Sequence, residues 1–184
     1  PLLKFFYNEN WQNTKSLSTL FRAQSEFNDD LIISYSDVVY QPELLKNLML
    51  SKYDITIAYD SKWENRYFGR GVDFLSEAEK ISQKQDGSFR IDKQTDDKEV
   101  VLGEFVGVFQ LKRSISNSLA NEIIEVLKEN NTSSVCDLIN HLQKDYSIGF
   151  IDVEGDWAEL DTPEDLINFK FGTKADTLKS LESK

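Results

Sequence analysis

The sequence has one cysteine, three prolines and eight glycines among its 184 residues. Cys136 has no partner for a disulfide within the chain, and the apolar residues around it predict a buried, inert thiol. No apolar run approaches the roughly 20 residues that span a bilayer, and the apolar start of the sequence is too short for a signal peptide. We therefore expect a soluble, cytoplasmic protein that has no membrane partner.

Basic residues are also scarce, since 21 lysines and arginines stand against 32 acidic residues and give a formal net charge of −11. A nucleic-acid backbone would be repelled unless a local basic patch overrode this charge. The densest basic clusters are Lys112-Arg113 and the stretch around Arg66 and Arg70, and both are too sparse for such a patch. The composition thus argues against nucleic acid as a partner.

Short apolar runs alternate with helical patterns along the chain, which predicts an α/β sheet with helices packed on its faces. Strands are expected at residues 2–7, 31–35, 55–59, 100–111 and 148–153, and helices at residues 16–25, 42–49, 114–128, 134–143 and 163–171. Between residues 79 and 93, two short runs flank an Asp-Gly pair, which predicts a β-hairpin insert. We expect one domain over residues 1–171, followed at 172–184 by a tail or linker leading to another domain.

Asp37 stands just after the strand expected at residues 31–35. In an open α/β sheet the ligand crevice lies at such strand ends, and a carboxylate there can hold Mg²⁺ against a substrate phosphate. An Asp at a strand end can equally cap a helix or form a turn. The position alone leaves both readings open.

Two longer motifs reduce the number of functions that the sequence could have. Residues 155–166 read GDWAELDTPEDL and residues 7–14 read YNENWQNT. The first resembles the closing motif of the sugar-phosphate and phosphocholine nucleotidyltransferases, and the second is similar to a segment that precedes their first catalytic aspartate. Further counterparts fall in the same order at residues 60–63, 77–80, 103–109 and 137–140.

The resemblance implies a Rossmann-like fold, with a mixed, mostly parallel sheet and helices on both faces. It also implies transfer of a nucleotidyl group, most simply cytidylyl from CTP, to a small phosphorylated acceptor such as phosphocholine, a phosphonate or a sugar phosphate. Asp37 and Asp161 would be the catalytic residues and the ligands of one Mg²⁺ ion. Pyrophosphate would be the second product.

Secondary site residues also follow from the resemblance. Glu104, Trp63 and Trp157 are expected to bind substrate, in particular a cationic end of the acceptor. Arg66 and Arg70, near two glycines, are expected to bind phosphate. Each of these residues also has an alternative role that does not involve substrate. The two tryptophans could serve for packing, Glu104 could form an ion pair with a basic neighbour, and the two arginines could be solvated.

The family's Gly-rich phosphate loop has no counterpart here, because the eight glycines are scattered from residue 69 to residue 172. We expect an N-terminally truncated domain that lacks about fifty residues, the length of two βα units. Such a fragment would be inactive alone. Its sheet would also have an exposed edge, through which the chain could self-associate.

Two departures from the family pattern favour a second reading. Ser36 stands where a glycine is usual before the first aspartate, and Lys15 stands where asparagine is frequent. The alternative function is therefore a non-catalytic domain that senses a nucleotide or sugar phosphate, or that serves as a scaffold. A glycosyltransferase is disfavoured because its metal-binding carboxylates lie close together in sequence, and only Asp96-Asp97 offers such a pair.

Overall fold

The computed structural model describes residues 3–67 and 72–171, and the side chains at 66, 72–74, 164, 168, 170 and 171 lie outside that description. The helices are α1 (Ser16–Arg22), α2 (Pro42–Leu50), α3 (Val72–Glu77), α4 (Arg113–Ser116), α5 (Leu119–Glu129), α6 (Val135–Leu142) and α7 (Pro163–Phe171). The strands are β1 (Leu31–Ser34), β2 (Val38–Tyr40), β3 (Ile55–Asp60), β4 (Lys80–Gln83), β5 (Phe89–Asp92), β6 (Val100–Leu111), β7 (Ile148–Asp152) and β8 (Trp157–Glu159).

The main sheet has the strand order β5-β4-β6-β3-β7, and β1 also pairs with β6. The long strand β6 is antiparallel to β1, β3 and β4, and β5 is antiparallel to β4, so that β3 and β7 form the parallel pair. The expected mostly parallel sheet is therefore wrong, although the sheet is mixed as expected. The reason is that β6 runs against all its neighbours, which the order of apolar runs along a sequence does not reveal.

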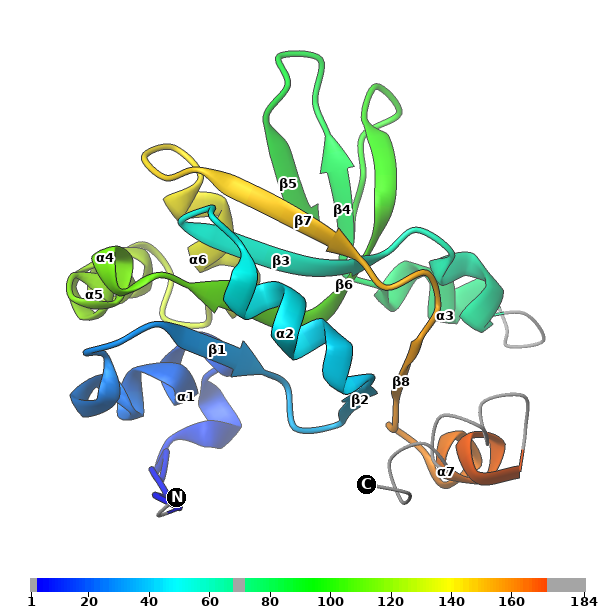
Figure 1. The fold of residues 1–184 in the computed structure, drawn as a ribbon, viewed down its shortest axis with the longest axis horizontal. Helices are drawn as coiled ribbons and strands as arrows, with labels where there is room; N and C mark the ends of the chain where they lie inside the picture. The colour runs from blue at the N-terminus through cyan, green and yellow to red at the C-terminus, as the bar shows by residue number, and fades with distance from the viewer. Residues whose placement is uncertain (1–2, 68–71, 172–184) are drawn as a thin grey trace.

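Helices cover both faces of this sheet, as the sequence predicted (Figure 1). Alternation along β3 separates the two cores, because successive side chains of a strand point to opposite faces. Ile55 and Ile57 pack with α1, α4, α5 and α6, whereas Ala58 packs with Leu44 and Leu48 of α2. Each apolar cluster fixes one layer of helices.

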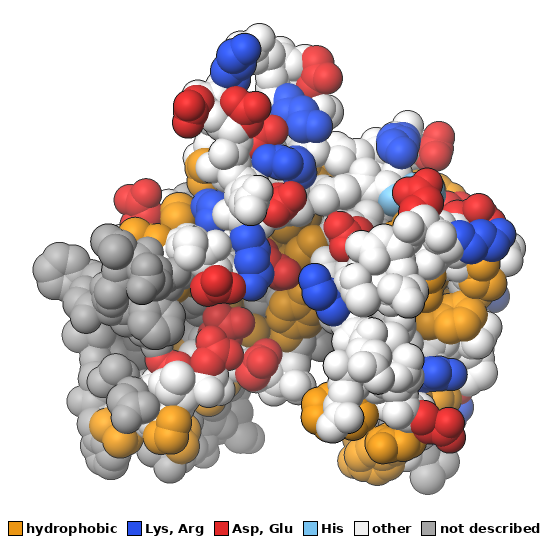
Figure 2. Space-filling view, turned by 180° about the vertical axis from the view of Figure 1, so that it is seen from behind, with side chains coloured by type: hydrophobic (Ala, Val, Ile, Leu, Met, Phe, Trp, Pro, Cys, Tyr) orange, Lys and Arg blue, Asp and Glu red, His pale blue; other side chains and the backbone are white. Residues whose placement is uncertain are grey.

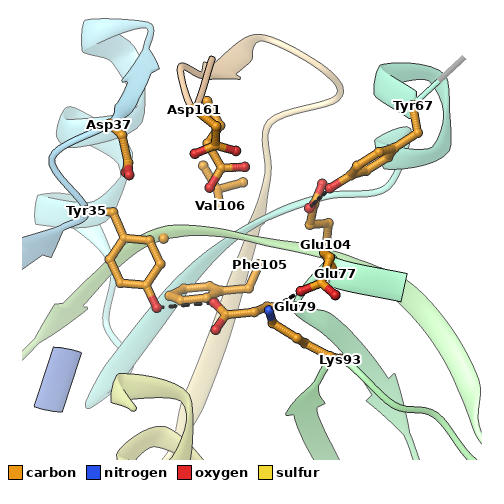
Figure 3. A pocket seen from close by; sticks show the side chains of 12 residues that line it. Tyr35, Asp37, Tyr67, Glu77, Glu79, Lys93, Glu104, Phe105, Val106 and Asp161 are labelled. Atoms are coloured by element: carbon orange, nitrogen blue, oxygen red, sulfur yellow. Dashed lines mark hydrogen bonds and ion pairs between the residues drawn. The ribbon is translucent and has the colours of Figure 1, made fainter. Parts of the chain in front are cut away.

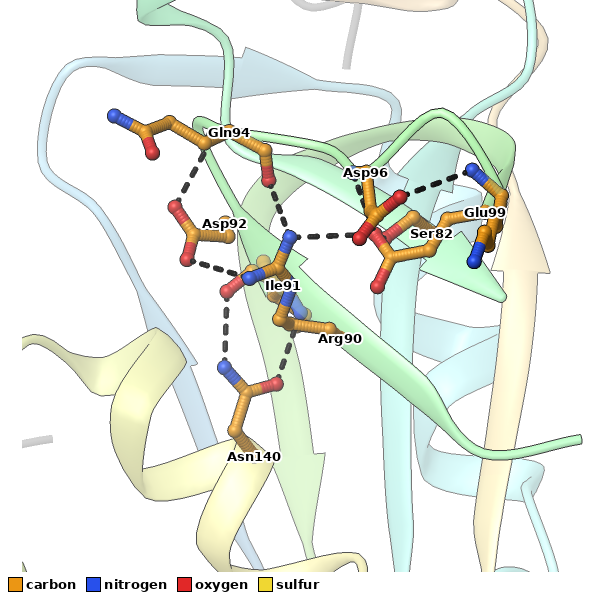
Figure 4. A network of polar contacts seen from close by, with 9 residues as sticks. Ser82, Arg90, Ile91, Asp92, Gln94, Asp96, Glu99 and Asn140 are labelled. Carbon is orange, nitrogen blue, oxygen red and sulfur yellow. Dashed lines mark hydrogen bonds and ion pairs between the residues drawn. The ribbon is translucent and has the colours of Figure 1, made fainter. Parts of the chain in front are cut away.

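The hairpin expected at residues 79–93 is present as β4 and β5, with Gly87 at φ +86° in its turn. The outer edge of β5 is covered by side chains of α6. The Asn140 side chain exchanges two hydrogen bonds of 2.9 Å with the backbone of Ile91, one from Nδ2 to the carbonyl oxygen and one from the amide to Oδ1 (Figure 4). Asn140 thus substitutes for a neighbouring strand and fixes the hairpin against the helix layer.

The strand expected at residues 2–7 is not formed over residues 3–7. Within the described ranges no strand pairs with this segment, and Leu3, Phe5 and Tyr7 are 84%, 90% and 75% exposed. An apolar alternation becomes a strand only where a partner supplies backbone hydrogen bonds. The segment therefore stays unpaired.

Within the part of the chain that is described, no helix has the length and apolar character needed to cross a membrane. In that same part, β7 pairs with β3 and β1 pairs with β6, so each presents one open edge. Self-association through such an edge remains a prediction.

Candidate active site

A small second sheet brings the two predicted aspartates together. β2 and β8 pair antiparallel, with Val38 opposite Glu159. One step beyond the last pair, the Leu160 amide donates a 2.9 Å hydrogen bond to the Asp37 carbonyl oxygen. Asp161 follows directly. The ribbon therefore places Asp37 and Asp161, which are far apart in the sequence, at the same end of two paired strands.

Both aspartates line one cavity of about 430 Å³. Figure 3 shows them pointing into it from one side, with Tyr35, Glu79 and Lys93 reaching in from the other. The acidic side chains that line it are Asp37, Glu77, Glu79, Glu104, Glu159 and Asp161. Acidic groups also gather around the hollowed middle of the molecule in the space-filling view (Figure 2). The cavity is thus strongly electronegative.

Gly107 and Tyr35 shape one wall of the cavity. Gly107 has φ +76°, and a Cβ added to it would lie 2.5 Å from the Tyr35 ring, so that a glycine is needed both for the backbone and for the ring. The Tyr35 hydroxyl donates a 3.1 Å hydrogen bond to Oε2 of Glu79. Burial raises the pKa of Tyr35. The phenol therefore stays neutral and holds the Glu79 carboxylate as a donor.

Glu104 lies on β6 at the opposite wall. Its side chain is buried, with 3% exposure, and Oε1 accepts a 2.5 Å hydrogen bond from the Tyr67 hydroxyl. This hydrogen bond holds the Glu104 carboxylate in one orientation at the cavity wall. The substrate-binding role expected of Glu104 agrees with this position and remains a prediction.

The two tryptophans do not line the cavity. Trp157 is 2% exposed and its Nε1 donates a 2.8 Å hydrogen bond to Oδ2 of the buried Asp60. Trp63 packs edge-on against Tyr67, with ring centroids 5.9 Å apart. These contacts agree with the alternative in which the two tryptophans serve for packing. The side chain of Arg66 and the whole of Arg70 lie outside the described residues, so their phosphate-binding roles stay predictions.

Sequence reasoning misses several residues of this cavity, among them Tyr35, Glu79 and Lys93. Glu79 belongs to one of the family-like motifs, whereas Tyr35 and Lys93 belong to none. Lys93 follows β5 by one residue and Tyr35 follows β1 by one, so that both stand at strand ends, as Asp37 nearly does. The position directly after a strand was therefore a usable signal. To apply this signal to Lys93, one must know that β4 and β5 belong to the main sheet.

Asp37 and Asp161 are suited to be the protein ligands of a Mg²⁺ ion. Both side chains are exposed to the cavity, and Mg²⁺ usually binds one or two carboxylates together with phosphate oxygens and retained waters. No cluster of three or more His, Cys, Asp or Glu side chains suited to a metal occurs among the described residues. A metal held here would therefore depend on substrate oxygens for the rest of its coordination.

The chain is similar to known nucleotidyltransferases in sequence and in fold. No family model matches the chain. A curated relative, the CTP:phosphoglutamine cytidylyltransferase of Campylobacter jejuni, is 24% identical over 180 residues, which cover 88% of this chain and 70% of that protein. The similarity extends along nearly the whole chain rather than over a single motif.

Solved structures share the fold. The inositol-1-phosphate CTP transferase of T. maritima matches with a TM-score of 0.62 at 15% identity, over 94% of this chain. A putative glucose-1-phosphate thymidylyltransferase of Bacillus anthracis, solved in complex with a sucrose, matches with a TM-score of 0.56 at 12% identity, over 83% of this chain. The chain spans 64% and 58% of these two structures. The α/β fold, with its mixed sheet, is that of the nucleotide-diphospho-sugar transferases, and the sequence is similar to that of a cytidylyltransferase.

Proposed function

We propose that this chain is a nucleotidyltransferase domain that transfers a cytidylyl group from CTP to a small phosphorylated acceptor. The convergence of Asp37 and Asp161 on one cavity carries this proposal. CTP is favoured over other nucleotides because the names of the curated relative and of one solved structure specify it. The acceptors named for these proteins are phosphoglutamine and inositol 1-phosphate. Phosphocholine, phosphonates and sugar phosphates are further members of the same class.

In the reaction, an oxygen of the acceptor's phosphate attacks the α-phosphorus of CTP. A new P–O bond forms, the bond between the α-phosphorus and its bridging oxygen breaks, and pyrophosphate leaves with that electron pair. Asp37 and Asp161 would orient the reacting phosphates at the rim of the cavity. Magnesium bound to them would neutralise charge on the α-phosphate. The side chains thus act by positioning and electrostatics, without a dedicated acid or base.

The first test measures pyrophosphate release from CTP, Mg²⁺ and a panel of phosphorylated acceptors by the natural protein that contains this sequence, for the wild type and for Asp37→Asn and Asp161→Asn. Each substitution keeps the size of the side chain but removes a ligand charge, so we expect the rate to fall by about 100-fold or more. Asp156→Asn, an exposed acid near the same strand, is the matched control and should leave the rate unchanged. Full activity of both site variants would refute the proposal.

The alternative is a domain that binds a nucleotide or sugar phosphate without turnover, or a scaffold. Ser36 and Lys15 favour it. Calorimetric titration with CTP and Mg²⁺ separates the possibilities. Binding without pyrophosphate release would support a sensor, and no binding would support a scaffold.

A further inference from the structure

A groove separate from the candidate active site lies beside the open edge of β7. It has a volume of about 600 Å³ and is formed by the β4–β5 hairpin, the end of α6 and β7. None of the described residues that line it lines the candidate active site. The hairpin rises behind β7 and past its open edge (Figure 1), and the rings of Phe89 and Phe150 meet edge-on with centroids 5.2 Å apart. The groove is therefore bounded by the hairpin on one side and by an edge strand on the other.

The edge strand carries backbone groups that have no partner. The Ile55 amide donates a 3.1 Å hydrogen bond to the Ser147 carbonyl oxygen, at the start of the β3–β7 ladder. Because alternate residues of a strand face the same neighbour, the backbone groups of Ile148, Phe150 and Asp152 point away from β3. These groups form no hydrogen bond with any described residue. A row of such groups is a template for one more strand.

The centre of the groove is apolar. Phe150 is 39% exposed, although its ring packs against Phe89 and Tyr59. Ile148 and Tyr146 continue the apolar lining towards the start of β7. A strand added at this edge would place one of its side chains directly beside Phe150, in the cross-strand contact that stabilises sheets.

Basic side chains mark one end of the groove. The cations that line it are Lys84, Arg90 and Lys144, and no acid is among the described residues of its lining. Arg90 is held by ion pairs with two nearby acids (Figure 4), whereas Lys84 and Lys144 are exposed and form no ion pair with a described residue. An anionic side chain would therefore be attracted to the start of β7 and repelled at its end, where Asp152 is exposed.

The shape of the groove selects the kind of partner. A whole second sheet, such as that of another copy of this chain, would meet the hairpin that rises behind the edge of β7 (Figure 1). A single extended segment needs only the space between the hairpin and that edge. Its backbone would pair with β7, and its acidic side chains would face the two lysines.

We propose that this groove binds an extended segment of a partner protein, which joins the sheet as a strand beside β7 and places acidic side chains next to Lys84 and Lys144. Antiparallel strand pairs are the commoner kind, and in that direction the acids stand at the C-terminal end of the segment. This inference does not depend on the proposed function, because the groove and the candidate active site share no described residue.

The test measures peptide binding to the natural protein that contains this sequence, by fluorescence anisotropy at physiological ionic strength, where distant charges are screened. The probe alternates valine with threonine and ends in two glutamates, and a matched peptide ends in two glutamines. Exposed ion pairs are weak, so the glutamate peptide should bind only about fivefold more tightly than the glutamine peptide. Combining Lys84→Gln with Lys144→Gln should abolish this difference. Lys98→Gln, at an exposed lysine in the loop after β5, is the control and should preserve it.

Hydrogen exchange tests the strand pairing itself. The Phe150 amide should exchange about tenfold more slowly when the glutamate peptide saturates the protein, because the added strand supplies an acceptor. The Ile32 amide is the internal control. It lies on the open edge of β1 and points outward, since the Tyr35 amide bonds to the Gly107 carbonyl oxygen, and its exchange should not change.

A peptide with N-methylated backbone amides should not bind, because it cannot pair as a strand. Failure of the glutamate peptide to bind, or equal binding of its N-methylated form, would overturn the inference. So would an unchanged exchange rate at Phe150, or slower exchange at Ile32 in its place.

Discussion

The buried hydrogen bonds of Asp60 give a sharp test of how the site is supported. Asp60 is 1% exposed, and its carboxylate accepts two hydrogen bonds of 2.8 Å, from Trp157 Nε1 to Oδ2 and from the Lys62 amide to Oδ1. Asp60→Ala leaves both donors without this acceptor. The buried Trp157 donor costs about 1–3 kcal/mol when it loses its partner, whereas the amide of the exposed Lys62 can bond to water instead, so we expect a total of roughly 2–3 kcal/mol. That is a large share of the usual 5–15 kcal/mol of domain stability.

The measurement is urea unfolding followed by far-UV circular dichroism, in which Asp60→Ala should lower the midpoint without changing the slope. Because Trp157 opens β8, the same change should speed hydrogen exchange at the Leu160 amide, which bonds to Asp37 across the ribbon. Asp156→Ala, an exposed acid directly before Trp157, is the control and should stay within about 0.5 kcal/mol of the wild type. If Asp60→Ala cost no more than this control, the reasoning would be refuted.

Three other predictions follow from single features of the structure. Gly107→Ala should destabilise the fold by about 1–3 kcal/mol and weaken ligand binding, because the added Cβ would clash with the Tyr35 ring at a positive φ; urea unfolding and CTP titration check this. Hydrogen bonds from Ser147 lower the pKa of Asp54, so the stability that Asp54 contributes is present above its unfolded pKa, near 3.9, and is lost as pH falls through the lower folded value. Asp54→Asn should therefore flatten the acid limb of a stability–pH curve, and an unchanged limb would contradict the assignment. Burial raises the pKa of the Cys136 thiol well above its usual value, so an aromatic disulfide reagent should label it at the rate of unfolding; rapid labelling of the native protein would show that the thiol is accessible.

The sequence and the structure agree where a local pattern decides the outcome. Pro42 begins α2 and the Asp-Gly pair turns the hairpin, because each residue limits the backbone whatever surrounds it. The pattern failed at residues 3–7, where strand formation requires a partner. It also failed for strand direction, since the burial alternation of a strand is the same for parallel and antiparallel pairing.

The candidate site shows the same division between what local sequence patterns predict and what depends on long-range contacts. The motifs supplied the family resemblance and Asp161, and the position of Asp37 after a strand made it the second candidate. That Glu79, Lys93 and Tyr35 share a cavity with them could not be read from the sequence, because it depends on the pairing of β4 with β6. The packing of Trp63 and Trp157 likewise depends on contacts with distant residues.

The sequence by itself determined the α/β class, the positions of most helices and strands and the resemblance to nucleotidyltransferases. These are properties of local periodicity and ordered motifs. Only the tertiary structure decided the strand directions, the meeting of Asp37 with Asp161 through the β2–β8 ribbon, and the charge of the cavity beside them. The physical reason is that strand pairing is a long-range hydrogen-bonded contact, and its register and direction depend on residues that no local stretch of sequence contains.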